Sequence, residues 1–352
     1  MPLGGIGAAR IEIRPSGSFF ASGGLVPLTF QLIHQADSKT RHFRLNSLVG
    51  TAGDSQLASN IRYQAKVPFA TLNYHFHDLS LEVILSAWSP FVPHQINCSS
   101  FSAAVLEFTV CNMTANHCQI AVIPALSGAS EFKLHHLNSP DSRINLAPAE
   151  TRSVTFLLSW PGIAFPAEQR IPLEAATRQF HSAFFESTLP AWELDAISAS
   201  WAESLISPSG FSPWFQMCEH ITGCNGLYSA AAKLIQNGQR EAGRECAYAA
   251  FLQREQAGHR FILSEAGWAE SAWSLYFAEF GIDYDASGEL LQLSPPGHDC
   301  QFVVITQTGW ATACWREADA FLTLQNQCGD LRIKTVEIRG RAVQVQIKPT
   351  SS

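Results

Sequence analysis

The chain has 352 residues, of which 46% are hydrophobic and 15% are charged, and its net charge is −7. This length favours two domains with sizeable cores. The acidic balance and the scattered Lys and Arg residues argue against binding to nucleic acid or to an anionic membrane surface, because both require a clustered basic field. No apolar stretch approaches the ~20 residues that span a bilayer, so we expect no transmembrane segment.

Nine cysteines are spread thinly along the chain, and none of them forms a Cys-x-x-Cys pair. This usage is typical of a reduced, intracellular protein with buried thiols. The first residues, Met1 to Gly7, lack the charged and apolar regions of a signal peptide. The sequence therefore predicts a cytoplasmic protein.

Two patterns that could hold a cofactor or a metal do not have the required context. Gly4-Gly-Ile-Gly7 precedes a predicted strand, whereas a dinucleotide fingerprint follows a strand and opens a helix. His75 and His77 share a strand face, but no acid or cysteine stands at ligand spacing from them. We expect neither a cofactor nor a metal.

Residues 1 to about 165 are predicted to form an antiparallel β-sandwich. Apolar and polar side chains alternate most clearly over 69–77, and the runs are short and broken by Gly, Pro and Asn. The predicted strands are 10–14, 27–35, 69–77, 79–88, 103–112, 118–124 and 153–160.

From about residue 172 the apolar residues recur at three- and four-residue steps, which indicates helices. The predicted helices are 172–187, 191–205, 220–236, 240–256 and 266–280. Strands return over 290–293, 301–306, 320–325, 331–338 and 342–347, and we expect their apolar face to pack on the helices or on the sandwich. The changes of period divide the chain into 1–165, 166–285 and 286–352.

Several stretches of residues 1–210 resemble one known domain, in the same order along the chain. The most informative is Ser86–Asn112, a proline-rich corner that leads into a strand. The others are Pro2–Gly7, Tyr63–Tyr74, Leu146–Phe156 and Ser187–Ala199. They are similar to the N-terminal β-sandwich of glycoside hydrolase family 116, the family of β-glucosidases and non-lysosomal glucosylceramidases, and to the helix that follows that sandwich.

A second block resembles the far end of the (α/α)6 catalytic toroid of that family and the β-tail after it. It includes Tyr228–Gly238, Trp273–Asp285 and Leu290–Pro296. The resemblance implies a mainly β protein with helices: a sandwich over 1–165, an incomplete toroid-like helical region over 166–285 and a small β-tail over 286–352. Between Gly210 and Tyr228, where the family has most of its catalytic domain, this chain has 17 residues.

The helical region is too short for a complete toroid. Twelve helices with their loops need at least roughly 200 residues, whereas Pro172 to Gly281 spans 110. The resemblance places both catalytic carboxylates of the family in the missing middle. We therefore predict no catalytic residue in this chain.

Four residues are the candidates for a remaining substrate-binding site. Glu265 resembles a family glutamate that grips the sugar hydroxyls, although Trp268 stands near the place of the expected arginine, and Ser264-Glu265 also fits a helix cap. Glu219 and His220 lie together, and a carboxylate in the first turn of a helix is also stabilised by the helix dipole.

Other acids and aromatic residues are weaker candidates. Asp283 and Asp285 follow a helix and are expected to be turn residues. Trp88, Trp192 and Trp273 fall on core-facing positions, so the better candidates for exposed sugar-stacking rings are Trp214, Trp268 and Trp310.

Three hypotheses about function remain open. The first is a contracted, catalytically inactive family 116 relative that binds a β-glucoside or glucolipid or acts as a scaffold. The second is an active glycosidase with a rebuilt acid pair at the junction of sandwich and helices, using Glu219, Glu265 or Asp285. The third is a truncated product without function. In each case exposed helix faces would favour a homo-oligomer or a covering partner chain.

Overall fold

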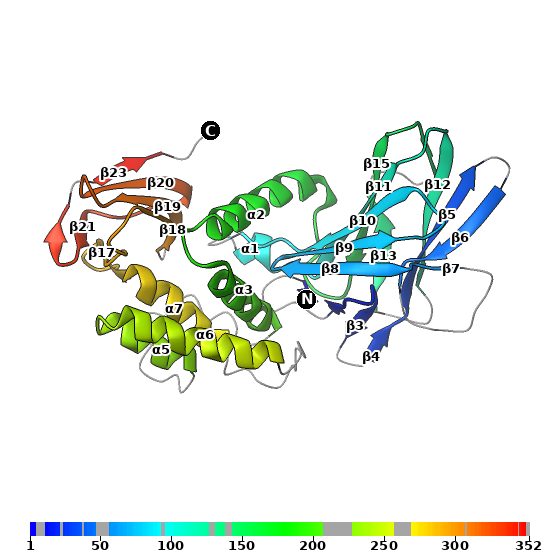
Figure 1. The fold of residues 1–352 in the computed structure, drawn as a ribbon. Coiled ribbons are helices and arrows are strands. Elements are labelled where there is room, and N and C mark those ends of the chain that lie inside the picture. Colours follow the sequence, from blue (N-terminus) through cyan, green and yellow to red (C-terminus); the bar gives the residue numbers. More distant parts are fainter. Residues whose placement is uncertain are drawn as a thin grey trace. The chain divides into compact units, whose positions relative to one another are not determined.

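The structure is a computed structural model that describes residues 1–4, 11–21, 24–36, 39–46, 56–92, 96–126, 131–137, 143–206, 227–256, 269–306, 308–343 and 345–349. Its contacts divide the chain into two compact units (Figure 1). Unit 1 comprises Met1–Phe91 and Asn97–Pro172, and unit 2 comprises Val92–Ile96 and Leu173–Ser352.

Unit 1 is built mainly from two large sheets, in which every described pairing is antiparallel except that of β6 with β7. The first contains β8 (Asn60–Lys66), β9 (Phe69–His75), β10 (Leu81–Trp88), β11 (Ala103–Asn112), β13 (Lys133–His136) and β15 (Thr151–Ser159). The second contains β5 (Leu28–Ala36), β6 (Lys39–Arg44), β7 (Gln56–Leu57), β12 (Cys118–Leu126) and β14 (Arg143–Leu146). A small sheet joins β1 (Pro2–Leu3), β2 (Ile11–Ile13), β3 (Phe19–Ala21) and β4 (Gly24–Val26).

Aromatic side chains fill the space between the two large sheets. The ring of Phe30 on β5 lies 4.7 Å from that of Phe108 on β11 and 5.4 Å from that of Phe156 on β15. All three are buried, so the inward positions of both sheets form one core, as in a sandwich. The predicted antiparallel pairing through β9, β10 and β11 is confirmed.

The sequence missed strands whose side chains are largely polar. The Asn60–Lys66 strand at the edge of its sheet and the Lys39–Arg44 strand show no clear run of buried apolar residues. Strands at the edge of a sheet, or beside a two-residue edge strand as β6 is, expose much of their surface, so their side chains need not alternate between apolar and polar. Alternation therefore predicts the central strands of this sandwich better than the edge ones.

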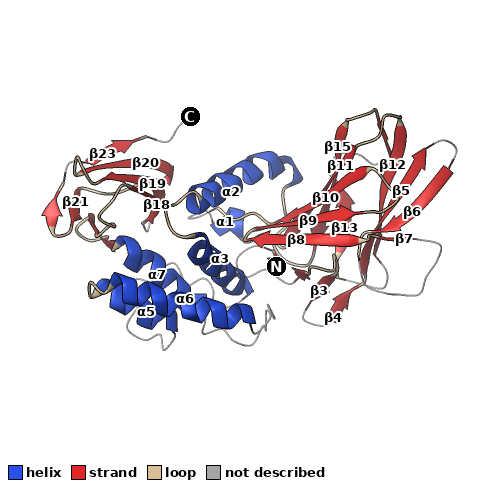
Figure 2. Cartoon of the chain, viewed as in Figure 1, coloured by secondary structure: helices blue, strands red, loops and turns tan. Residues whose placement is uncertain are grey.

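Unit 2 begins with helices and ends with strands (Figure 2). Its helices are α2 (Arg170–Phe185), α3 (Ala191–Ile206), α5 (Leu227–Gln236), α6 (Arg240–Gln256) and α7 (Ala269–Phe280), and the first three residues of α2 belong to unit 1. Two short helices, α1 (Ile96–Ser99) and η1 (Ala167–Gln169), precede these five in the chain. Pro172 lies in the first turn of α2, where its missing N–H is not needed. Residues 207–226 and 257–268, which hold the predicted starts of two helices, lie outside the described residues.

The C-terminal strands form two four-stranded sheets. One contains β16 (Asp283–Asp285), β17 (Leu290–Leu293), β21 (Thr335–Ile338) and β22 (Arg341–Ala342). The other contains β18 (Cys300–Ile305), β19 (Gly309–Arg316), β20 (Phe321–Gly329) and β23 (Val345–Lys348). Asp283 and Asp285 therefore begin and end a strand, and the prediction that both are turn residues is wrong for Asp283.

These strands pack on helices of the same unit, as predicted. Phe302 of β18 stacks on Phe280 of α7 at 4.3 Å, and Trp310 of β19 meets Phe180 of α2 edge-on at 5.1 Å. Trp310 is buried, so its prediction as an exposed platform is wrong. Trp88 is buried as predicted. The mainly β fold with helices is confirmed, while the toroid-like nature of the helical part stays a prediction.

Candidate functional site

The four predicted substrate-binding residues, Glu219, His220, Glu265 and Trp268, lie outside the described residues. Their roles stay predictions. Asp285 is described, and its carboxylate accepts hydrogen bonds from the Ser287 hydroxyl at 2.6 Å and the Ser287 N–H at 2.9 Å. These bonds hold the pKa of Asp285 below its ordinary value. Asp285 thus shapes the turn that follows β16 and remains ionised, which does not suit a proton donor.

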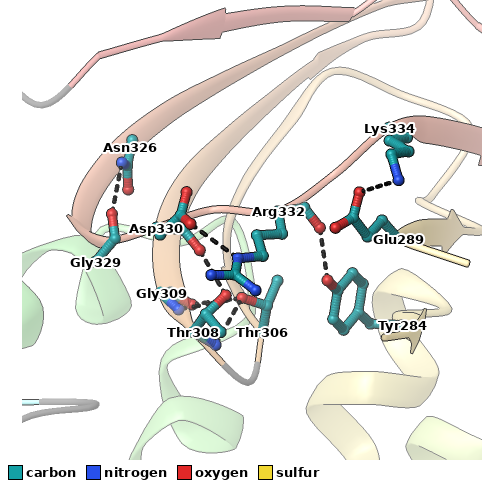
Figure 3. A network of polar contacts seen from close by, with 10 residues as sticks. All are labelled: Tyr284, Glu289, Thr306, Thr308, Gly309, Asn326, Gly329, Asp330, Arg332 and Lys334. Carbon is teal, nitrogen blue, oxygen red and sulfur yellow. Dashed lines mark hydrogen bonds and ion pairs between the residues drawn. The ribbon is translucent and has the colours of Figure 1, made fainter. Parts of the chain in front are cut away.

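A network of polar contacts links the ends of the C-terminal strands (Figure 3). Tyr284 donates a hydrogen bond from its hydroxyl to the Arg332 carbonyl at 2.5 Å, and Arg332 pairs with Asp330 at 2.8 Å. Lys334 pairs with Glu289 at 2.8 Å. Each of these side chains already has a partner within a turn or between neighbouring strands, so the network explains how the strands are held together and offers no reactive group.

Helices α3, α6 and α7 bring together two carboxylates that we did not predict as a pair. Glu193 of α3 is 1% exposed and Glu279 of α7 is 0% exposed. Arg240 and Arg244, one turn apart on α6, accompany them. We call these four residues the Glu–Arg cluster.

Glu279 is the anchor of the Glu–Arg cluster. Arg244 binds it with both arms of the guanidinium, Nε to Oε1 at 2.6 Å and Nη2 to Oε2 at 2.8 Å. Arg240 adds an ion pair at 3.5 Å and a hydrogen bond from Nη2 to the Glu279 carbonyl at 2.8 Å. Two parallel charge-assisted bonds fix both distance and orientation, so this pair ties α6 to α7.

Glu193 is in a different state. Neither of its carboxylate oxygens has a hydrogen-bond partner among the described residues. Burial, and after it the nearby charge of Glu279, raise the pKa of Glu193, while Arg244 and Arg240 lower it, and the net result is a pKa of about 8. At neutral pH the cluster therefore contains one protonated carboxyl group beside one arginine-bound carboxylate.

An aromatic patch lies next to the Glu–Arg cluster and consists of Trp192, Tyr248 and Phe251. The Trp192 ring is 5.2 Å from that of Tyr248 and 5.8 Å from that of Phe251. Trp192 is half-buried, although its position predicted a core residue, and Tyr248 is 44% exposed. Because Arg244, Tyr248 and Phe251 stand four and three residues apart on α6, they share one helix face.

Helical periodicity could have identified the buried acids. Glu193 stands one turn before Ile197 on α3, and Glu279 stands one turn after Leu275 on α7. Both apolar residues are fully buried, so each glutamate occupies a position of the apolar stripe of its helix. An acid on such a stripe needs a partner. On α6 the i, i+4 spacing of Arg240 and Arg244 places two basic side chains on one helix face, and this pattern could have predicted them as the partners.

A shallow apolar cavity of about 460 Å³ lies in unit 1. Phe101, Phe165 and Ile163 contribute much of its lining, and Cys98 and Gln169 add the polar atoms. The lining contains no acid or base. This cavity therefore offers apolar contact without an acid–base pair.

Two further searches cover only the part of the chain described by the structure. In that part no three His, Cys, Asp or Glu side chains gather as metal ligands would. Likewise, none of the helices in that part combines the length and the apolar character needed to cross a bilayer.

Comparison with known proteins locates the similarity in the first part of the chain. A comparison with curated proteins gives no match. Among solved structures, a putative kojibiose phosphorylase from the human microbiome is 12% identical, with a TM-score of 0.22; the match covers 58% of this chain and 38% of that one. Our chain thus covers well under two thirds of that structure. Residues 1–133 match the family model described as "beta-glucosidase 2, glycosyl-hydrolase family 116 N-term", so over these residues the resemblance to glycoside hydrolase family 116 is confirmed.

Proposed function

We propose that this chain is a contracted relative of the family 116 glycoside hydrolases that binds carbohydrate without hydrolysing it. The match of residues 1–133 to the N-terminal domain of the family supports the relationship. The expected ligand is a β-glucoside, either free or as the headgroup of a glucolipid. The observation that carries the proposal is that both members of the acid pair, Glu193 and Glu279, are buried.

Hydrolysis with retention needs two carboxyl groups about 5–5.5 Å apart that face the sugar from solvent-accessible walls. Glu279 has both oxygens bound by Arg244, and it is fully buried. Glu193 is equally closed to solvent. A sugar ring has no access to either group, so this pair supports helix packing and not catalysis.

Carbohydrate binding is supported by the aromatic patch. The apolar face of a pyranose stacks on aromatic rings, and Tyr248 and Trp192 both keep part of their surface exposed. The neighbouring side chains of Arg240 and Arg244 are 28% and 34% exposed. Their guanidinium groups are hydrogen-bond donors that suit sugar hydroxyls.

A specific observation favours the second candidate, an active glycosidase with a rebuilt acid pair. A general acid must be protonated near the working pH, and the raised pKa of about 8 keeps Glu193 in that state at neutrality. Opening of the helices would then have to expose Glu193 and Glu279 together. Glu219, Glu265 and Asp285 remain the other acids of this alternative.

Turnover of an aryl β-glucoside with a good leaving group separates the two candidates, because such a substrate needs little help from an acid. We expect hydrolysis no faster than the uncatalysed background. Loss of nucleophile and acid removes covalent catalysis and the ~10²–10⁴-fold of general acid assistance. Turnover that disappears in Glu193→Gln, Glu219→Gln or Glu265→Gln would establish the rebuilt site instead.

Calorimetric titration with an alkyl β-glucoside tests binding at the aromatic patch. Trp192→Ala should weaken binding at least about fivefold, since stacking on an aromatic ring contributes roughly 1 kcal/mol or more. Phe20→Ala, which removes a half-buried aromatic ring in unit 1, is the matched control and should bind like the wild type. Equal binding by both variants would place the ligand elsewhere, and no binding by the wild type would refute the proposed function.

We also propose a cytoplasmic location and a covering partner, most simply a second copy of the chain. None of the seven cysteines among the described residues forms a disulfide, which suits a reducing compartment. Tyr248 and Leu252 leave apolar surface exposed on α6. Sedimentation at increasing protein concentration should show a dimer, and a monomer at every concentration would contradict this part of the proposal.

A further inference from the structure

Among the described residues of the helical part, Glu193 is a buried acid whose two carboxylate oxygens both lack hydrogen bonds. A buried carboxyl group without hydrogen bonds is costly, and each such group in a native structure needs a physical explanation. Glu193 has no hydrogen-bond partner among the described residues, and only 1% of its surface is exposed. It also stands in the first turn of α3, the helix that packs on α7 and touches α6.

The charged groups that face Glu193 come from both neighbouring helices. From α6 they are Arg240 and Arg244, and from α7 the group is Glu279. Arg244 already donates two hydrogen bonds to the Glu279 carboxylate. Arg240 donates a hydrogen bond to the Glu279 carbonyl and forms an ion pair with its carboxylate. An ionised Glu193 would therefore be a buried charge without a hydrogen bond, close to a like charge.

The aromatic patch lies on α3 and α6, two of the helices that also carry the Glu–Arg cluster. Trp192 directly precedes Glu193 on α3, and Tyr248 stands one turn after Arg244 on α6. The Trp192 ring touches both Tyr248 and Phe251. A shift of the first turn of α3 away from the Glu–Arg cluster would therefore carry Trp192 away from its aromatic partners.

We propose that Glu193 is a proton-controlled latch between α3 and the α6–α7 pair: the neutral acid keeps the first turn of α3 closed, and loss of its proton to solvent releases that turn together with Trp192. Ligand binding at the aromatic patch is then lost when the latch opens. This last link rests on the proposed carbohydrate binding, whereas the release of α3 does not.

The direction of the pH effect follows from linkage. The pKa of Glu193 is about 8 in the folded protein, above its ordinary value of 4.5, mainly because burial disfavours the charge. Between these values the folded protein holds a proton that the unfolded chain has lost, so the folding equilibrium weakens by up to about tenfold for each pH unit. The stability that the neutral Glu193 contributes is complete below the lower pKa, falls progressively between the two values, and is lost once pH has risen through the upper one.

Hydrogen exchange of the α3 backbone, followed between about pH 6 and 10 and corrected for the intrinsic pH dependence of exchange, tests the latch. In the wild type the protection of Ala191–Ile206 should fall by up to about tenfold per pH unit as pH rises toward 8, and it should level off above that pH. Glu193→Gln keeps the shape of the neutral acid and should stay protected throughout. Glu245→Gln, which alters an exposed carboxylate on α6, should follow the wild type. The same loss of protection in Glu193→Gln and in the wild type would overturn the proposal.

Infrared titration of the wild-type protein provides a second measurement that does not depend on how a variant folds. A carbonyl band of a protonated carboxyl group should be present at neutral pH and give way to carboxylate bands near pH 8. Absence of that band at neutral pH would refute the latch. Alkyl glucoside titrations complete the test: binding that fails at every pH refutes the proposed function alone, whereas binding that persists after α3 opens refutes the link to the patch.

Discussion

Asn112 at the end of β11 shows how much of the sandwich depends on one side chain. Its amide donates hydrogen bonds to the carbonyls of Asn116 at 2.8 Å, Ala147 at 3.1 Å and Leu146 at 3.3 Å. Its oxygen accepts bonds from the N–H and the hydroxyl of Thr114. Asn112 begins an Asn-x-Thr triplet, but it is completely buried and satisfied by the protein itself.

Replacement of Asn112 by Ala should destabilise unit 1 by about 2–4 kcal/mol, because it leaves buried carbonyl groups unpaired. Urea unfolding followed by circular dichroism measures this loss. Asn145→Ala is the control, since that exposed side chain makes a single hydrogen bond with Gln119. Similar midpoints for the two variants would contradict the structural role of Asn112.

Arg244 and Arg178 allow a second comparison of single residues. Arg244→Met would leave Glu279 as a buried charge without its bidentate partner, so we expect a loss of about 3–5 kcal/mol. Arg178→Met removes an exposed pair with Glu174 one turn away on α2, and should cost at most about 0.5 kcal/mol. Thermal unfolding of both variants provides the measurement, and equal shifts would show that Glu279 does not depend on Arg244.

The contact between α5 and α6 depends on a glycine. A Cβ atom at Gly243 would lie 2.5 Å from Ile235 Cγ1 and 2.7 Å from the Ala231 carbonyl oxygen. These distances are too short for any side chain, so the two helices approach each other only because position 243 has none. Helix propensity alone would favour alanine at this position.

Gly243→Ala should therefore destabilise unit 2 by about 1–3 kcal/mol, as overpacking usually does, in spite of the better helix former. Ala242→Gly at the exposed neighbouring position measures the propensity term by itself, about 1 kcal/mol. Chemical denaturation of both variants separates the two effects. A stabilised Gly243→Ala protein would mean that α5 moves away without loss.

Sequence patterns predicted the helices and strands that have one apolar face. The predicted helix 240–256 has the bounds of α6, and the predicted strand 103–112 those of β11. The patterns missed the edge strands of the sandwich, the placement of Trp310 and the pairing of Glu193 with Glu279. These depend on which elements become neighbours in space, and alternation within one element carries no information about that.

At the scale of the whole molecule, each unit has a core of its own. The aromatic core of unit 1 is formed by Phe30, Phe108 and Phe156, whereas Phe280 and Phe302 pack within unit 2. The family match covers residues 1–133, all of which belong to unit 1 except Val92–Ile96. A domain with its own core is able to fold alone.

We therefore expect residues 1–172 to fold when expressed separately. The fragment should give a β-type circular dichroism spectrum and one cooperative unfolding transition. In the complete chain the Asn112→Ala and Gly243→Ala substitutions should then shift different transitions. An unfolded fragment would show that unit 1 requires unit 2 for its stability.

The burial of Trp310 provides an optical reporter of the C-terminal strands. Its indole lies edge-on against Phe180 of α2 at 5.1 Å and is 1% exposed, and its N–H has no hydrogen-bond partner among the described residues. An indole held in such dry surroundings emits at shorter wavelength than one in water, so detachment of β19 from α2 would shift its emission to the red. The difference between the emission spectra of the wild type and Trp310→Phe would thus follow the docking of these strands without any added dye.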